Sequence, residues 1–448
     1  MSRSDATLSG GASPVLLQQI AALYRAGRRR EALDACRRFL AAEPRRADVL
    51  ALAGQVAEEL GEAAEAVAHY AAAVAVKPDF AEAQYNLGNL LVRVGRRDEA
   101  VDAYRRAAKL RPDLAPVHAN LGNVLYALRR WDEAVASHRR ALALTPNAAE
   151  AHRNLGIALH EAGDLLGSID CFRRAVALKP HWPKALQSLA NSLMEHGDWR
   201  AAIEICDAWL KLVPANVEAL GLKAVALEEL GDRAGARYLV DFERFVRMIE
   251  FSTPPEGFAG MAEFNAALAR HALEHPTLKV PPETDPRYHC ATLRITEEFL
   301  AEPKGPAAPF ERMIERAASD YIRDLARLDP AHPFLVNPPR RWQLTSWAAV
   351  LDGQGNLNPH VHYAGYISGV YYPKIPEPIG AQGEGRAGWF QFGGNPERFP
   401  CKTVPETRAI RPREGLMLLF PSYFYHRTVP FTAPEPRVSI AFDAIPAA

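Results

Sequence analysis

The pattern of hydrophobic and polar residues divides the chain into two parts with different periods. Up to about Glu250, apolar residues recur at the spacing of amphipathic helices, and the whole pattern repeats every 34 residues. From about Pro333 onward, apolar and polar residues alternate, and β-branched and aromatic residues gather in short runs between turn-rich segments. We therefore expect a helical repeat array followed by a domain built of strands.

Prolines and glycines mark the 34-residue period. The prolines are Pro44, Pro78, Pro112, Pro146, Pro180 and Pro214. Each is expected to end the second helix of a unit, because proline lacks an N–H and its ring clashes with the preceding turn. The glycines are Gly27, Gly61, Gly95, Gly163, Gly197 and Gly231, with Arg129 as the single exception. They permit the turn between the two helices of each unit.

This unit resembles the tetratricopeptide repeat. The segment AEAQYNLGNLLVRVGRRDEAVDAYRRAAKLRP, residues 81–112, matches the pattern of that repeat closely. Six units run from about Ser13 to Asn216. A seventh keeps the glycine but loses the terminal proline, so we expect it to cap the solenoid. The resemblance implies a protein or peptide partner on the concave surface.

Asparagines recur in the first helix of several units. They are Asn86, Asn120 and Asn154 at position six, and Asn89, Asn123 and Asn191 at position nine. Because a carboxamide both donates and accepts, a ladder of them can bind an extended peptide backbone without reading its side chains. The ladder resembles that in the repeat arrays of protein O-linked glycosyltransferases. Alternatively, these residues follow the repeat consensus and face solvent.

The second part of the chain is expected to hold helices first and strands afterwards. Residues 251–330 carry apolar residues at helical spacing and predict a helical connector. In residues 331–448, runs such as GYISGVYYP, GLMLLFP and RVSIAFDAI indicate an antiparallel sandwich or barrel of the jelly-roll kind. The predicted architecture is an α + β multidomain chain. A disordered tail (1–12) precedes an α-solenoid of about seven units (13–250), the connector and the strand domain.

Three histidines near the end of the chain have the spacing of a metal site. His360 and His362 precede one strand, His426 follows another, and Arg437 comes eleven residues later. Residues i and i+2 of an extended chain point to the same side, so the first two imidazoles can face one ion. We expect His426 to come from the opposite sheet. A site with two of the three, or histidines with a purely structural role, are the alternatives.

The order H-x-H, a distal H and R-x-S resembles the double-stranded β-helix of iron(II)- and 2-oxoglutarate-dependent oxygenases. The strand SGVYY after the first pair is similar to that of a bacterial subgroup related to prolyl hydroxylases. The resemblance implies these site residues: Fe(II) ligands His360, His362 and His426, and cosubstrate contacts Arg437, Ser439 and Tyr372. The planar guanidinium matches a carboxylate with two parallel bonds. No catalytic residue is implied beyond the metal site.

One position departs from the family pattern. His362 stands where these oxygenases usually carry a carboxylate, so three neutral imidazoles would leave Fe(II) with its full charge. The 2-oxoglutarate dianion could compensate when bound. The nearest acidic residue that could serve as a different third ligand is Asp352. Loss of catalysis is a further alternative.

Composition narrows the function classes. Acidic and basic residues balance at 53 each, so net charge indicates neither nucleic acid nor an anionic membrane as partner. The five cysteines are scattered, and no apolar run reaches 18 residues, which favours a cytoplasmic location. The expected function is a 2-oxoglutarate- and Fe(II)-dependent dioxygenase acting on a protein or peptide recruited by the repeats. The rivals are a non-enzymatic adaptor and, from the asparagine ladder alone, a glycosyltransferase; the strand-rich C-terminal part argues against the latter.

Overall fold

The computed structural model describes residues 14–281, 292–301, 304–352, 354–380 and 385–447. The chain divides after Pro180 into two compact units, which are described separately. The tail expected at residues 1–12 lies outside the described residues. None of the described helices combines the length and the apolar character needed to cross a membrane.

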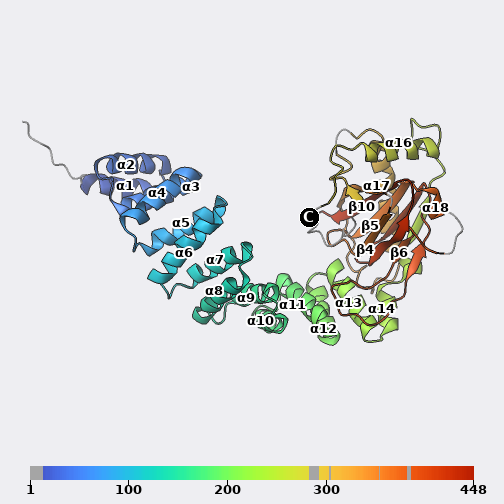
Figure 1. Cartoon of the computed structure of the whole chain (residues 1–448), viewed down its shortest axis with the longest axis horizontal. Helices are drawn as coiled ribbons and strands as arrows, with labels where there is room; N and C mark the ends of the chain where they lie inside the picture. Colours follow the sequence, from blue (N-terminus) through green and yellow to red (C-terminus); the bar gives the residue numbers. More distant parts are fainter. Residues whose placement is uncertain (1–13, 282–291, 302–303, 353, 381–384, 448) are drawn as a thin grey trace, which may run out of the picture. The chain divides into compact units, whose positions relative to one another are not determined.

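Helices in the first unit follow the predicted 34-residue period, with two helices to each repeat (Figure 1). They are α1 (Pro14–Arg25), α2 (Arg29–Ala42), α3 (Ala47–Glu59), α4 (Ala63–Val76), α5 (Ala81–Arg93), α6 (Arg97–Leu110), α7 (Ala115–Ala127), α8 (Trp131–Leu144), α9 (Ala149–Glu161) and α10 (Leu165–Leu178). Each packs against the next along the chain. The α-solenoid prediction is therefore confirmed.

Glycines in the first helices of the repeats allow the two helices of a repeat to pack closely. The pairs are Gly54 with Tyr70, Gly88 with Tyr104, Gly122 with His138 and Gly156 with Phe172. A Cβ at Gly88 would come within 2.7 Å of the facing ring, so no larger residue fits. The turn glycines have a different role, because they adopt positive φ angles that L-residues disfavour. Arg129, the exception to the glycine series, takes the same conformation with φ 57°.

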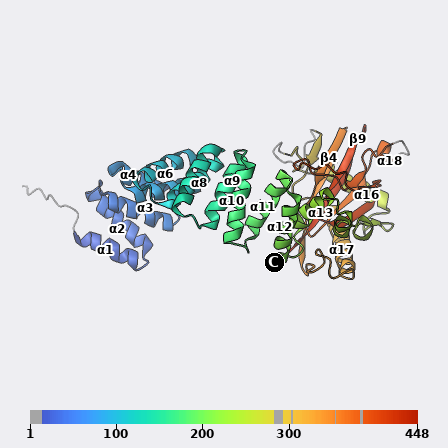
Figure 2. The ribbon, with the colours of Figure 1, turned by 90° about the horizontal axis from the view of Figure 1, so that it is seen from below.

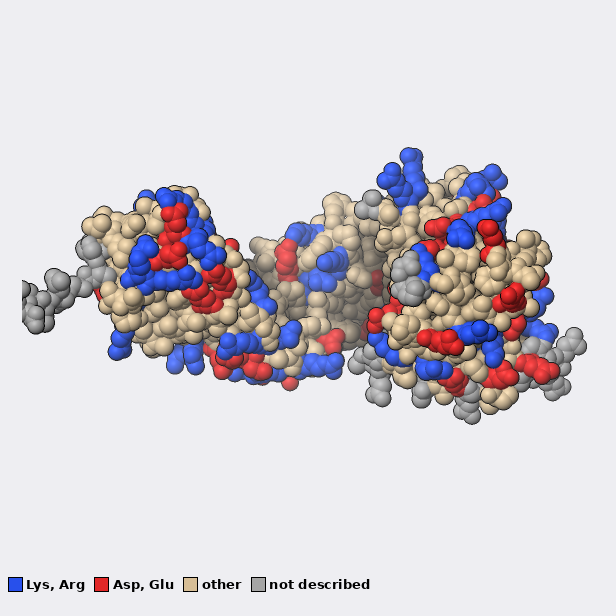
Figure 3. Space-filling view, turned by 90° about the horizontal axis from the view of Figure 1, so that it is seen from above, with Lys and Arg blue, Asp and Glu red and all other residues tan. Residues whose placement is uncertain are grey.

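Charged side chains of both signs are intermixed on the surface (Figure 3). In the first unit, for example, Arg37 pairs with Glu65 at 2.7 Å and with Asp34 on its own helix. Such exposed pairs contribute little to stability individually. They agree with the balanced charge of the sequence.

The second unit begins with the last two repeats and continues into the strand domain. Its helices are α11 (Pro183–His196), α12 (Trp199–Leu212), α13 (Val217–Glu229), α14 (Arg233–Leu239), α15 (Phe242–Phe245), α16 (Met261–Leu273), α17 (Ala307–Leu325) and α18 (Glu377–Gly380). Its strands are β1 (Arg247–Glu250), β2 (Leu293–Ile295), β3 (Trp342–Leu351), β4 (Gln354–His360), β5 (Ile367–Lys374), β6 (Phe390–Phe392), β7 (Arg408–Ile410), β8 (Leu416–Pro421), β9 (His426–Thr432) and β10 (Arg437–Pro446).

Two antiparallel sheets form the strand domain, as the jelly-roll prediction requires. The larger sheet has the order β1-β8-β5-β10-β3-β2, and the smaller has the order β4-β9-β6-β7. Strand β1 precedes the boundary expected at residue 250, and β2 lies inside the segment expected to be a helical connector. Both extend the larger sheet at its two ends, β1 by pairing with β8 and β2 by pairing with β3. Short strands of three or four residues carry too little alternation to be recognised from sequence.

Helices α13 and α14 of the last repeat lie beside the strand domain (Figures 1 and 2). The last repeat also shares a hydrophobic core with that domain. Leu220 of α13 and Phe245 of α15 are fully buried in one cluster with residues of the larger sheet. The Tyr423 hydroxyl donates to the Leu239 carbonyl oxygen at 2.6 Å. The Glu229 carboxylate accepts backbone N–H groups of Lys402 and Thr403 at 2.9 and 3.0 Å. Helices α13 to α15 are thus part of the strand domain's packing, although their sequence continues the repeat.

Candidate metal centre

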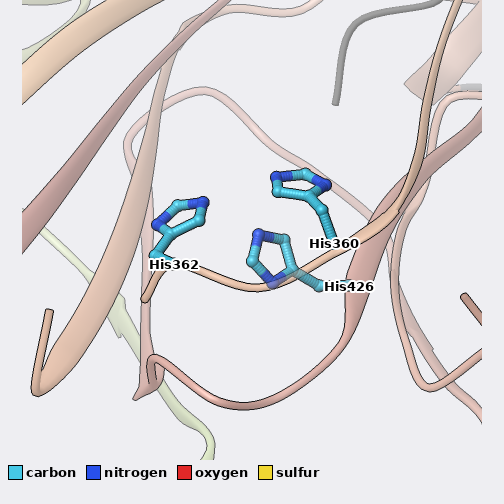
Figure 4. A group of neighbouring side chains, drawn as sticks. All are labelled: His360, His362 and His426. Atoms are coloured by element: carbon cyan, nitrogen blue, oxygen red, sulfur yellow. The ribbon is translucent and has the colours of Figure 1, made fainter. Parts of the chain in front are cut away.

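Three histidine side chains converge in the strand domain (Figure 4). His360, His362 and His426 each offer one ring nitrogen, and these nitrogens all lie within 4.8 Å of one another. His362 and His426 are buried, and His360 is half-buried. Among the described residues, this is the one group of three or more potential metal ligands.

Two of the three histidines are neighbours in the smaller sheet. His360 ends β4 and pairs directly with His426, which begins β9, and their ring centroids are 4.4 Å apart. The expectation that His426 comes from the opposite sheet is therefore wrong. The reason is that β4 and β9 are adjacent strands, which the sequence order does not reveal. His362 follows β4, where its backbone N–H donates to the Ser422 carbonyl oxygen.

In all three imidazoles, the Nδ1 atom is hydrogen-bonded to an oxygen of the protein. The Nδ1 atoms of His360 and His426 lie 2.8 and 2.9 Å from the carbonyl oxygens of Asn358 and Phe424, and that of His362 lies 2.7 Å from Asp443 Oδ1. Carbonyl and carboxylate oxygens only accept, so each Nδ1 carries the proton. The lone pair of each ring is then on Nε2, which is the form that binds a metal.

Burial also favours the neutral imidazole. Burial lowers the pKa of His426 well below its usual value, and the neighbouring His360 and His362 lower it further. An uncharged ring keeps its lone pair available at neutral pH. The cluster is therefore suited to a divalent cation.

A buried guanidinium lies beside the histidines. Arg437 is 1% exposed, and its Nη1 donates to the Thr428 hydroxyl at 3.1 Å. Thr428 is two residues after His426 on β9, so both side chains face the same side, roughly 7 Å apart along the strand. Among the described residues, no carboxylate forms an ion pair with Arg437, and its Nε has no hydrogen-bond partner. Burial lowers the pKa of this guanidinium, which reflects the cost of an unpaired buried cation.

The other two predicted cosubstrate residues differ in their surroundings. Tyr372 lies on β5 with its ring 5.2 Å from the Arg437 guanidinium carbon, and its buried hydroxyl has no partner among the described residues. Burial raises the pKa of Tyr372 to about 12, so the hydroxyl keeps its proton at neutral pH. Ser439 donates to the Ala349 carbonyl oxygen at 3.4 Å. That bond is long, and the role of Ser439 stays a prediction.

The alternative ligand Asp352 lies elsewhere. Arg294 holds its two carboxylate oxygens with Nε at 2.7 Å and Nη2 at 3.1 Å. The structure does not bring Asp352 to the three histidines.

The residues of the strand SGVYY, 368–372, differ in role according to the face of the sheet on which they lie. Ser368 and Tyr372 face the histidine side, where they approach Asp443 and Arg437. Gly369 faces the helices, and a Cβ there would come within 2.2 Å of the Phe442 ring. The Tyr371 hydroxyl, on that same face, donates to Asn265 Oδ1 of α16.

Asp443 is the residue that sequence reasoning missed. Its Oδ1 accepts from His362 Nδ1 and, at 2.6 Å, from the Ser368 hydroxyl. An available signal was its position six residues after Arg437, an even number that places both side chains on one face of β10. Nothing in the spacing of the motif connects Asp443 with His362.

Several of the predicted peptide-binding asparagines bond to one another in the structure. Asn120 Nδ2 donates to Asn89 Oδ1 at 2.9 Å, and Asn154 Nδ2 to Asn123 Oδ1 at 3.5 Å. The Tyr104 hydroxyl also donates to Asn89. Asn191, in the second unit, donates to Glu218 at 2.8 Å. Asn86 lies close enough to the Tyr70 hydroxyl to lower its pKa, although burial raises that pKa overall. The series links successive repeats, and peptide binding by it stays a prediction.

Comparison with known protein families supports both halves of this description. Residues 54–95, 89–129 and 122–163 match the family described as "TPR repeat", and residues 188–241 match "Tetratricopeptide repeat". Residues 345–443, which contain the three histidines and Arg437, match the family described as "Putative 2OG-Fe(II) oxygenase". These matches confirm the two resemblances expected from the sequence. No curated protein matches the chain.

Several solved structures are similar to part of this chain. The protein YrrB, titled "a TPR protein with an unusual peptide-binding site", is 22% identical with a TM-score of 0.39, covering 42% of this chain and 97% of its own. MamA from Desulfovibrio magneticus RS-1 is 24% identical with a TM-score of 0.35, covering 37% and 94%. PilF from Pseudomonas aeruginosa is 21% identical with a TM-score of 0.35, covering 44% and 90%.

Proposed function

We propose that this protein is an Fe(II)- and 2-oxoglutarate-dependent dioxygenase that hydroxylates a protein or peptide recruited by its repeats. The observation that carries the proposal is the orientation of three imidazoles whose Nδ1 protons are all anchored. The Nε2 lone pairs of these three rings would supply one face of a coordination sphere, since one ring nitrogen of each lies within 4.8 Å of the others. The opposite positions stay open for a chelating 2-oxo acid and O2.

The residues around the cluster fit the cosubstrate as well as the metal. A buried arginine without a carboxylate partner among the described residues is costly unless an anion neutralises it. The far carboxylate of 2-oxoglutarate would supply that anion, with Arg437 as a bidentate donor and the Tyr372 hydroxyl as a further donor. His360, His362 and His426 would hold the Fe(II).

When bound, Fe(II) with 2-oxoglutarate and O2 supplies the oxidation that converts a C–H bond to C–OH, while 2-oxoglutarate becomes succinate and CO2. The chain provides the setting for this chemistry. The three histidines fix the metal, and Arg437 fixes the direction in which the cosubstrate lies. The buried aromatic surroundings, which include Phe390 stacked on His426 at 5.2 Å, limit the access of water.

The packing of the last repeats supports recruitment of a macromolecular substrate. Helices α11 and α13 are the first helices of their repeats, and polar side chains connect them. The Glu218 carboxylate of α13 accepts hydrogen bonds from Gln187 at 2.6 Å and from Asn191, both on α11. The pKa of Tyr363, the residue after His362, is raised mainly by burial, and the nearby Glu218 carboxylate raises it further. A segment bound along α11 and α13 would therefore be held near the metal at high effective concentration.

Succinate formation tests the proposal. We expect the purified chain to release succinate from 2-oxoglutarate only with Fe(II) and O2, and His426→Ala to abolish this release. Arg437→Ala should suppress release at low 2-oxoglutarate and recover in part at high 2-oxoglutarate. Unchanged succinate release in both variants would refute the site. His271→Ala, at a histidine outside the cluster, serves as the control.

A non-enzymatic adaptor is the second candidate, because the direct ligands hold no carboxylate. Equilibrium binding of Co(II) separates the two. If the protein is an adaptor, wild type and His426→Ala should bind Co(II) equally weakly. If it is the proposed enzyme, wild type should bind Co(II) clearly more tightly than His426→Ala.

A further inference from the structure

We propose that Asp443 supplies, through His362, the negative charge that the direct ligands of the metal lack. The inference rests on the proposed metal site and adds a positioning residue to it. The feature that carries it is a buried hydrogen bond of 2.7 Å between His362 Nδ1 and Asp443 Oδ1. Their side chains are only 6% and 8% exposed.

Asp443 acts on one histidine and not on the other two. His360 and His426 donate to neutral carbonyl oxygens two residues earlier in the chain, whereas His362 donates to a carboxylate. A carboxylate on Nδ1 makes the opposite nitrogen a stronger donor to a metal than a carbonyl does. His362 is therefore the most electron-rich of the three ligands, at the position where the oxygenase pattern has a carboxylate.

The rest of the network keeps this carboxylate in place. The Ser368 hydroxyl donates to Asp443 Oδ1 at 2.6 Å and lies 2.8 Å from the Ser422 hydroxyl. A Cβ at Gly365 would come within 2.6 Å of Ser422 Oγ and 3.1 Å of Asp443 Cβ, so a side chain is excluded there. Among the described residues, His362 is the one basic group that pairs with Asp443. The charge of Asp443 is thus directed to the metal site and not to a salt bridge elsewhere.

The charge count follows from this arrangement. Three neutral imidazoles alone leave a divalent ion with two positive charges, while two imidazoles and a carboxylate leave one. Asp443 lies one hydrogen bond further from the metal, and its negative charge would again reduce the net charge of the site to one. It does so without occupying a coordination position. We therefore expect the site to retain a divalent metal nearly as well as a site with a direct carboxylate.

Co(II) affinity of the full chain tests the inference without requiring turnover. Asp443→Asn keeps the size and an acceptor oxygen but removes the charge, and we expect it to weaken Co(II) binding roughly 10- to 100-fold. Ser368→Ala removes a hydroxyl that donates to the same carboxylate and lies 3.0 Å from His362 Nδ1, but it keeps the charge, so a clearly smaller loss than that of D443N is expected. Equal affinity of wild type and D443N would overturn the inference.

A second pair of variants separates the charge from a general effect on folding. His362→Asp places a carboxylate among the direct ligands, so D443N should no longer weaken Co(II) binding in that background. A loss in the H362D background as large as in wild type would show that Asp443 acts on the fold and not through His362. Thermal unfolding of each metal-free variant provides the matching check on stability.

The wild-type protein alone gives a third measurement. With Zn(II) bound and histidine labelled with ¹⁵N, the Nδ1 proton of His362 should give the most downfield of the three ligand resonances, because its acceptor is charged. A His362 proton on Nε2 would overturn the inference even if D443N did not fold. If wild type binds neither Co(II) nor Zn(II), the proposed function itself fails, whereas binding without an effect of D443N refutes only the role of Asp443.

Discussion

His360 and His426 face each other as a directly paired couple on β4 and β9, and each ring bonds to the carbonyl oxygen two residues before it. The same local device therefore orients both rings, and backbone pairing of the smaller sheet sets their separation. Only His362 depends on a partner distant in sequence. The candidate site thus combines a pair held by neighbouring strands with one histidine whose ring is oriented by a residue of β10.

Replacement of Arg437 by lysine should separate cosubstrate binding from metal binding. Lysine keeps the positive charge but loses the planar fork that bonds a carboxylate twice. We expect the KM for 2-oxoglutarate to rise roughly tenfold or more, from the loss of one charge-assisted hydrogen bond of about 1.5 kcal/mol or greater. Steady-state succinate assays measure the change. Co(II) affinity serves as the control, and a parallel loss there would contradict the assignment of Arg437 to the cosubstrate.

Replacement of Glu229 by glutamine should loosen the attachment of α13 to the strand domain. The carboxylate accepts two backbone N–H groups and the Thr403 hydroxyl, and these bonds lower its pKa although burial raises it. Loss of the charge should destabilise the second unit by about 1 kcal/mol. Glu228→Gln is the matched control, because burial raises the pKa of Glu228 and a neutral residue should be tolerated there. Thermal unfolding compares the two, and equal transitions would contradict the prediction.

His138 should make the repeat array sensitive to acid. Burial lowers the pKa of this side chain to about 4, and it lies where other repeats carry Tyr104 or Phe172. The unfolded chain takes up a proton as pH falls below about 6.5, while the folded protein does not until about pH 4. Stability contributed by the neutral ring is therefore complete above pH 6.5 and is lost progressively between 6.5 and 4. At pH 5 the loss is about 2 kcal/mol.

His138→Phe should remove this part of the pH dependence. Urea unfolding followed by far-UV circular dichroism at pH 7.5 and pH 5 measures it. The difference between the two pH values should be smaller in the variant than in wild type. The exposed His181→Gln serves as control and should leave the difference unchanged.

Arg129→Gly should stabilise the first unit. Arg129 has φ 57°, a left-handed conformation that costs an L-residue about 1 kcal/mol relative to glycine. The equivalent residue Gly163 has φ 88° with no atom within 4 Å of an added Cβ, so Gly163→Arg should destabilise by a similar amount through the backbone alone. Urea unfolding of both variants tests the pair. Opposite shifts of similar size are expected, and a neutral R129G would contradict the argument.

Much of the fold could be predicted because its signals are local. A proline every 34 residues and the small residues between them determine the helix pairs, since each proline ends a helix wherever the partner lies. The three histidines and Arg437 could be recognised for the same reason, because their order and spacing along the chain form a local motif. Strands β1 and β2 were not predicted, because three or four residues are too few to establish an alternating pattern.

Other features depend on which strands become neighbours. The sheet that carries His426 and the bond between His362 and Asp443 both follow from strand order, and the second joins residues 81 positions apart. Asp352 illustrates the converse, because it is only eight residues before His360 in sequence, yet Arg294 holds it away from the site. Nearness along the chain was a poor guide to the partner of His362.

The division of the chain after Pro180 has a practical consequence for shortening this protein. A fragment that starts at residue 251 would leave out Leu220, Phe242 and Phe245, and buried rings that pack against them, such as Phe392 and Phe424, would be exposed to water. A fragment that starts at residue 181 keeps that cover. The smallest piece expected to express as a folded strand domain therefore includes the last two repeats.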